Sequence, residues 1–264
     1  MLRISRWKGP ALLLAAAALA AGTGRAESDL LMDYPGFLGS IPASTYDVDR
    51  KQVGEARLVI DKLVNGNVRI SSESGFTGGA RTVATAELVP VEGRHKLRPV
   101  LQESRSLDPD GNALGLLSID HVRGVASCRN ADGEIREEVA LPSNDRVANV
   151  PLNLLFLPLV RHEKKEVAFQ FFLCGGGAHF MDFVANLAPS SSNGKQPQKV
   201  VEVRYGPDFG LVTLVAQNFV PKLSFWFDTK APHRWVAHRL PLYGKGPEVF
   251  VVRDGVPTNW LGDN

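Results

Sequence analysis

The chain has 264 residues, of which 44% are hydrophobic and 22% charged, with a formal net charge of +2. Four basic residues, Arg3, Arg6, Lys8 and Arg25, lie within the first 26 positions, so the rest of the chain carries a net charge of about −2. This near balance argues against a general binder of nucleic acid or of anionic membranes, because such proteins need an excess of basic side chains.

The first 26 residues have the three parts of a secretory signal peptide. Basic residues within Arg3–Lys8 come first, the apolar run Ala11–Ala21 follows, and small residues surround Ala26. The run is far shorter than the ~20 apolar residues that span a bilayer, so we expect cleavage rather than anchoring. A lipid anchor would need a cysteine just after the run, and the first cysteine is Cys128. We therefore predict a periplasmic or secreted protein with no transmembrane anchor after cleavage.

Between residues 55 and 141 the sequence alternates short β-rich segments with turn signals. Glu55–Val64 and Val68–Ser72 flank Asn65-Gly66, a pair that favours the tight turns of β-hairpins. Asp108-Pro-Asp-Gly111 and Asp132-Gly133 mark further turns, since these residues adopt the backbone conformations that turns require. The other strands predicted here are Thr82–Val89, Lys96–Ser104, Gly115–Cys128 and Glu134–Leu141.

The middle of the chain holds an apolar segment, residues 150–160, that contains two prolines. Pro151 suits the first turn of a helix, and Pro158 would end or kink it, which predicts one short buried helix. Glu166–Cys174 has aromatic residues on both faces, as in a central strand that is covered on both sides. After three glycines, another strand is expected at Ala178–Leu187.

The last third resumes the strand pattern after Pro189–Pro197, a stretch rich in serine that we interpret as a flexible surface loop spanning 189–199. A linker between two domains is the alternative. The strands predicted after it are Val200–Arg204, Leu211–Asn218, Leu223–Phe227, Arg234–Arg239 and Val249–Arg253. About a dozen strands with short connections predict a single all-β domain at 27–264, built as one antiparallel curved sheet, half-barrel or barrel with one or two short helices.

Two cysteines, Cys128 and Cys174, remain in a chain that we expect in an oxidising compartment. An even number of cysteines in an exported protein favours a disulfide. The bridge would close a loop of about 46 residues and stabilise the fold by roughly 3–4 kcal/mol. Two buried free thiols on separate strands are the alternative.

Motifs of known catalytic and cofactor sites are missing from the sequence. It has no G-x-S-x-G, no H-E-x-x-H and no phosphate-binding loop. Cys174, His179 and Met181 are ligand types that suit copper, but a disulfide at Cys174 would remove the best of them. We therefore predict no catalytic residue, no metal and no cofactor.

Aromatic residues are concentrated in the later half of the chain, where most of them should form the core. On a curved sheet, however, one face can also line a cavity for an apolar ligand. The residues that we expect to contact such a ligand are Phe169, Phe171, Phe225, Phe227 and Trp235.

Three stretches resemble a known family. They are Tyr46-Asp-Val-Asp49 with Val53–Leu58, the mid-chain apolar segment before a strand, and the late strand pair Leu223–Leu240. In the late pair, a strand that ends at Asp228 is followed by a turn with Pro232 and a return strand. The pattern resembles domain of unknown function 3108, a family of the bacterial envelope, over about residues 46–253. The resemblance implies an envelope location and a β-rich fold.

Three functions follow from these observations. The first is non-enzymatic binding of a hydrophobic small molecule, a lipid or acyl chain, on the concave face of the sheet. The second is a structural or assembly role in the cell envelope, with envelope proteins as partners. The third is hydrolysis by dispersed residues, for which the candidates are Asp120, His121, His179 and Asp182.

Overall fold

The structure, a computed structural model, describes residues 30–76, 78–174, 177–189, 199–208, 210, 223–241 and 248–260. The predicted signal peptide, the strand predicted at Leu211–Asn218 and residues 190–198 of the predicted loop lie outside them. Among the described residues, no helix is long and apolar enough to cross a membrane.

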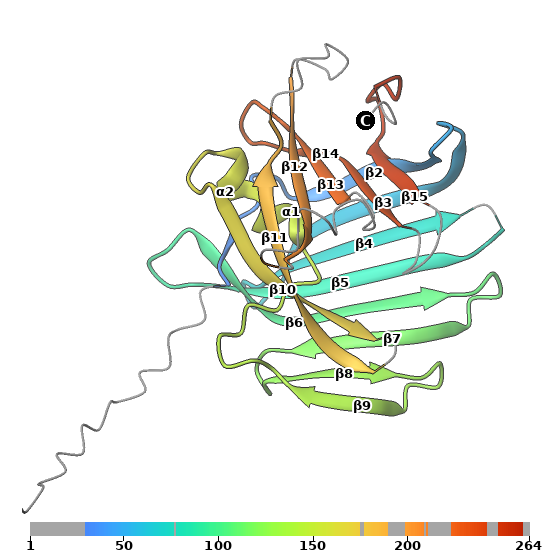
Figure 1. The fold of residues 1–264 in the computed structure, drawn as a ribbon, viewed down its shortest axis with the longest axis vertical. Helices are drawn as coiled ribbons and strands as arrows, with labels where there is room; N and C mark the ends of the chain where they lie inside the picture. Colours follow the sequence, from blue (N-terminus) through green and yellow to red (C-terminus); the bar gives the residue numbers. More distant parts are fainter. Residues whose placement is uncertain are drawn as a thin grey trace, which may run out of the picture.

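The described residues form one antiparallel sheet in which most strands pair with their neighbours in the sequence (Figure 1). Its order is β10-β11-β12-β13-β14-β15-β2-β3-β4-β5-β6-β7-β8-β9, and β1 pairs with β6. The sheet does not close on itself, so the predicted all-β fold is confirmed in its open, curved form. The strands are β1 (Met32–Asp33), β2 (Gly39–Asp47), β3 (Gln52–Lys62), β4 (Val68–Phe76), β5 (Arg81–Pro90), β6 (Lys96–Leu107), β7 (Ala113–Asp120), β8 (Val125–Arg129), β9 (Ile135–Ala140), β10 (Glu166–Cys174), β11 (Ala178–Leu187), β12 (Val200–Pro207), β13 (Leu223–Asp228), β14 (Trp235–Pro241) and β15 (Glu248–Arg253).

The two ends of the sheet curl toward each other, so that β10 crosses the concave side of β7 and β8 (Figure 1). The predicted disulfide is confirmed, and Cys128–Cys174 joins β8 to β10. The N–H of Ala178 in β11 also donates to Glu137 Oε2 of β9, at 2.7 Å. A covalent bond and a hydrogen bond therefore connect the two ends of the sheet, β8–β9 and β10–β11. We call this junction, where the backbone ladder stops, the seam.

The prediction of one strand over Gly115–Cys128 is wrong, because a turn divides it into β7 and β8. The Asp120 carboxylate accepts the N–H groups of Val122 and Arg123, and Gly124 has a φ of +70°. Aspartate and glycine at these positions form the turn by side-chain bonding and by a left-handed backbone. Strands β1 and β2 lie where no strand was predicted.

Two short helices, α1 (Leu152–Leu155) and α2 (Leu157–Val160), occupy the segment that predicted one. Pro158 lies in the first turn of α2, where the missing N–H of proline has no helical partner to lose, and the predicted break falls just before it, at Phe156. Phe156 between the two helices is fully buried. Its ring contacts those of Phe169, Tyr205 and Phe225, so the helices fill the concave side of the sheet.

The interpretation of Glu166–Cys174 as a central strand is wrong, because β10 ends the strand order of the sheet. Both faces of β10 are nevertheless covered. Phe169 belongs to the main core, whereas Phe172 packs with Ile119 and Ala126 of β7 and β8. The second face of β10 is covered because the sheet curls until β7 and β8 pack against it. From the strand sequence alone, the same pattern indicates separate layers packed on the two faces of a central strand.

Candidate ligand-binding cavity

Small side chains on the concave face of β3–β7 create room for a cavity. Residues two apart on a strand share a face, so the pairing registers define rows that run across the strands. The side chains of one row are buried: Ile60, Ile70, Ala86, Gln102 and Ile119. The next row has smaller groups at its centre: Leu58, Ser72, Ala84, Ser104 and Leu117. The third row begins with Ala56, Ser74 and Thr82. These short side chains leave space that the opposite wall does not fill.

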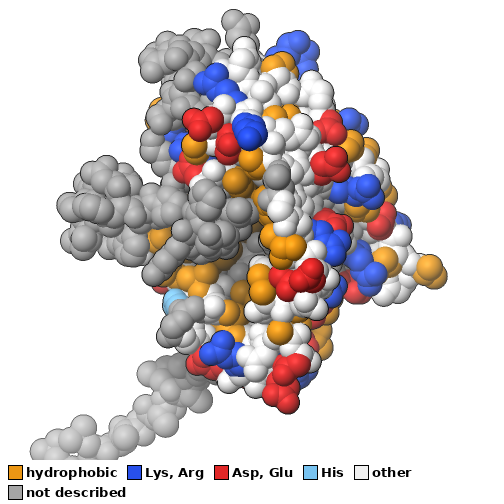
Figure 2. All heavy atoms as spheres, turned by 90° about the vertical axis from the view of Figure 1, so that its right-hand side faces the viewer, with side chains coloured by type: hydrophobic (Ala, Val, Ile, Leu, Met, Phe, Trp, Pro, Cys, Tyr) orange, Lys and Arg blue, Asp and Glu red, His pale blue; other side chains and the backbone are white. Residues whose placement is uncertain are grey.

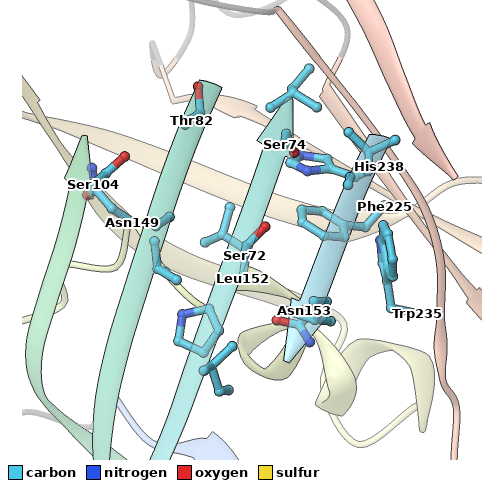
Figure 3. Close-up of a pocket in the computed structure, with 18 of the residues that line it drawn as sticks. Ser72, Ser74, Thr82, Ser104, Asn149, Leu152, Asn153, Phe225, Trp235 and His238 are labelled. Carbon is cyan, nitrogen blue, oxygen red and sulfur yellow. The ribbon is translucent and has the colours of Figure 1, made fainter. Parts of the chain in front are cut away.

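The cavity has a volume of about 290 Å³. Figure 3 shows Ser72, Ser74 and Thr82 on the strand side, with Phe225 and Trp235 across from them. Figure 2 shows hydrophobic side chains beside a hollow in the molecule, and acidic and basic side chains interspersed over the outer surface. One wall of the cavity, called the hydroxyl wall below, thus carries hydroxyl groups among small and apolar side chains, and the wall across from it carries aromatic rings.

A β-bulge places two residues of β14 on the same wall. Trp235 and His238 are three residues apart and would face opposite ways on a regular strand. The register between β13 and β14 shifts between Trp226 and Phe227, so that Phe227 pairs with Trp235 and Phe225 pairs with His238. The extra residue reverses the alternation, and both side chains line the cavity.

His238 is held as a neutral ring by its surroundings. It stacks on Phe225 with ring centroids 3.7 Å apart, and its Nε2 lies 2.7 Å from the Tyr205 hydroxyl. Burial lowers the pKa of His238 to about 3, and burial raises the pKa of Tyr205 above its ordinary value. At neutral pH the Tyr205 hydroxyl therefore donates to His238 Nε2, and the imidazole proton lies on Nδ1.

Gln102 of β6 positions the floor of the cavity, which comprises Asn149, Val150 and the start of α1. Its Oε1 accepts the N–H groups of Asn149 at 2.7 Å and of Val150 at 2.9 Å. Its Nε2 donates to the Val147 carbonyl at 3.0 Å and to His121 Nε2 at 2.7 Å. Gln102 is fully buried, and all four of its hydrogen-bonding positions are used.

The cavity carries no side-chain charge from the described residues that line it. Arg57 and His238 are the titratable residues among them. Arg57 is exposed and lies between Ala56 and Leu58, so strand alternation places its side chain on the outer face, opposite Glu73. His238 is neutral, so the described lining offers hydroxyl groups on one side without offering an ion.

Three of the five predicted ligand-contacting residues, Phe171, Phe225 and Trp235, line the cavity. Phe169 and Phe227 are 1% exposed and lie in the main core. Phe227 instead borders a smaller cavity of about 30 Å³, which Trp235 also lines. Sequence reasoning did not single out the hydroxyl wall or His238. The small residues at alternate positions of β4 and β5 could have indicated the hydroxyl wall. They can be interpreted in this way only once it is known which face of each strand points inward.

The four hydrolase candidates have separate partners in the structure. Asp120 accepts the N–H groups of its own turn, and Nδ1 of the exposed His179 lies 3.0 Å from the Gly177 carbonyl oxygen. Asp182 accepts from the Gln170 amide at 2.9 Å. His121 Nδ1 lies 2.9 Å from Asp145, but its Nε2 is occupied by Gln102. The histidine–aspartate pair therefore has no ring nitrogen available to a substrate.

A metal site is not found in the part of the chain that the structure describes, where no three histidine, cysteine or acidic side chains gather. Cys174 is in the disulfide, so the copper ligand set considered from the sequence lacks its thiol.

No family model matches the chain, and no curated protein matches it. Among solved structures, a β-barrel-like protein of domain of unknown function DUF1849 from Brucella abortus covers 81% of this chain and 94% of its own. The two share 6% sequence identity with a TM-score of 0.45. A likeness at this level says nothing about activity, and the resemblance to domain of unknown function 3108 stays a prediction.

Proposed function

We propose that the protein is an exported, non-enzymatic binding protein that holds a hydrophobic small molecule or lipid acyl chain in the cavity. The observation that carries this proposal is the cavity itself, walled by Phe171, Phe225 and Trp235 on the concave side of a disulfide-tied sheet. Ligand sites in proteins are concave and mostly apolar, with a few polar groups that orient the ligand.

The volume limits what can be bound. At about 290 Å³, the cavity lies near the lower end of the ~300–1,000 Å³ range of small-molecule sites. It suits one short acyl chain or part of a longer one. A whole two-chain lipid would extend beyond it, so we expect a single chain to be sheltered.

The disulfide supports the location, because such bonds persist in oxidising compartments. Together with the signal peptide predicted for the first 26 residues, it favours the periplasm. An exported protein that shelters an apolar chain there would let the chain cross an aqueous space.

Native mass spectrometry tests the proposal. The protein is exported to a bacterial periplasm, purified without detergent and measured intact, and bound material is extracted with organic solvent for identification. We expect a stoichiometric apolar adduct. A bare mass together with co-purifying envelope proteins would instead favour the structural or assembly role.

A cavity-filling variant ties the adduct to this site. Ala84→Leu adds bulk to the row between Ser72 and Ser104, whereas Thr85→Leu adds bulk on the opposite face of the same strand. We expect Ala84→Leu to lose the adduct and to weaken binding of the uncharged fluorescent probe Nile red by about tenfold or more. Thr85→Leu should retain both, and equal losses in the two variants would place the ligand elsewhere.

A further inference from the structure

The hydroxyl wall has free hydrogen-bonding capacity. Ser72, Ser74, Thr82 and Ser104 line the cavity, and within the described ranges none of their hydroxyl groups bonds another side chain or a backbone group. Ser224 on the outer face differs, since its hydroxyl donates to Glu202 at 2.8 Å. A hydroxyl group donates one hydrogen bond and accepts two, so the wall can serve both donors and acceptors of a ligand.

The aromatic wall includes an indole whose N–H group is buried. Trp235 is 8% exposed, and its Nε1 is buried without a hydrogen-bond partner among the described residues. Buried indole N–H groups normally find an acceptor, because leaving one unpaired is costly. This nitrogen is itself shielded from the cavity space, so Trp235 offers a ligand the surface of its ring rather than a hydrogen-bond donor.

Among the described residues that line these walls, an ion would find no counter-charge. The Arg57 side chain lies on the outer face of β3, and the Tyr205 hydroxyl caps the neutral ring of His238 at 2.7 Å. Burying an unpaired carboxylate or ammonium costs far more free energy than burying a neutral group with the same hydrogen bonds.

We infer that the cavity selects an uncharged amphiphile, an acyl or alkyl chain with an oxygen-bearing head such as an alcohol or glyceride, over ionised fatty acids and alkyl ammonium ions. The head lies against the hydroxyl wall and the chain lies against Phe171, Phe225 and Trp235. This inference rests on the proposed function and names the ligand class of the same site.

The spacing of the hydroxyl groups favours a head with more than one oxygen. Ser74 and Thr82 are direct cross-strand partners, which places their side chains about 5 Å apart. Ser72 and Ser104 lie on either side of Ala84 of β5. They are therefore two strand spacings, or about 10 Å, apart. A glycerol ester spans the shorter distance with adjacent oxygens, so it should bind more tightly than a simple alcohol.

Displacement of Nile red by ligands that share one decyl-length chain tests the selection. Glycerol monodecanoate and decanol are compared with decanoate and decyltrimethylammonium at pH 8, each below its micelle-forming concentration. We expect the neutral pair to displace the probe and both ions to bind at least about tenfold more weakly, because their charges stay unpaired. Equal or tighter binding of either ion would overturn the inference while leaving the proposed function intact. If Nile red does not bind at all, the proposed function fails as well.

Paired variants test the hydroxyl wall itself. Ser74→Ala combined with Thr82→Val removes two hydroxyl groups with little change in volume. The control combines Ser71→Ala with Thr85→Val, a cross-strand pair on the outer face of the same two strands. The first double variant should bind glycerol monodecanoate roughly tenfold more weakly, as the loss of two hydrogen bonds implies, with Nile red unaffected. An unchanged affinity for the glyceride, or an equal loss for Nile red, would overturn the role of these hydroxyls.

Discussion

Asn149 binds the backbone of Phe172 through both ends of its side-chain amide. Its Nδ2 donates to the Phe172 carbonyl at 2.8 Å, and its Oδ1 accepts the Phe172 N–H at 2.9 Å. Nearby, the Ala148 N–H donates to the Gln170 carbonyl, and the Gln170 N–H donates to the Arg146 carbonyl, both at 2.8 Å. The segment before α1 thus pairs with β10 along the edge opposite β11. These hydrogen bonds attach the floor of the cavity to β10.

Asn149→Ala should destabilise the protein by about 2 kcal/mol, because two hydrogen bonds worth about 1 kcal/mol each are lost. Urea unfolding followed by circular dichroism measures the change. The matched control is Asn153→Ala, a second asparagine of the cavity lining whose side chain makes no hydrogen bond to the described part of the chain. Equal destabilisation by the two substitutions would contradict the role given to Asn149.

Gln102→Met should cost more than Asn149→Ala, roughly 3 kcal/mol or more, because methionine fills a similar volume but leaves buried backbone groups unpaired. The N–H groups of Asn149 and Val150 lose their acceptor. Hydrogen exchange should therefore show reduced protection at these two amides. Gln52→Met, at an exposed glutamine of β3, serves as control and should change stability by no more than about 0.5 kcal/mol. Unchanged protection at Asn149 would rule out the proposed anchoring.

Replacement of Cys128 and Cys174 by alanine should lower the free energy of unfolding by roughly 3–4 kcal/mol, since the 46-residue separation leaves a long loop unconstrained in the unfolded chain. The bond joins β8 to β10, so hydrogen exchange should accelerate in β10 and β11 more than in β3–β5. Reduction of the native protein should reproduce both effects. A uniform loss of protection would show that the bond does not act at the seam in particular.

The neutral state of His238 predicts acid sensitivity. Burial lowers the pKa of His238 from 6.5 to about 3 in the folded protein, so between these values the unfolded chain binds the extra proton. The contribution of the neutral His238 ring to the free energy of unfolding is complete above pH 6.5 and is lost as the pH falls toward 3. His238→Gln keeps an acceptor for Tyr205 but does not titrate, so its free energy of unfolding should fall less steeply over this window. Urea midpoints measured at a series of pH values test this, and identical slopes in the two proteins would contradict it.

The strand pattern was readable from the sequence wherever turns carry their own chemistry. Ala178–Leu187 was predicted with the bounds of β11, because glycines precede it and it is rich in aromatic and aliphatic residues. The turn between β7 and β8 was overlooked, since Asp120 and Gly124 enclose three residues that continue the strand-like composition. The bulge at Trp226 and Phe227, which brings Trp235 and His238 onto one wall, has no local sequence mark at all.

By itself the sequence determined the fold class and the pair of cysteines, because alternation, turn residues and cysteine number act over a few neighbouring positions or on composition. Only the tertiary structure decided the cavity. Ser72 and Ala84 meet on one face because β4 and β5 align in a particular register, and Phe225 faces them because the ends of the sheet curl together. Such contacts join residues far apart in the chain, and they depend on long-range packing that no local pattern specifies.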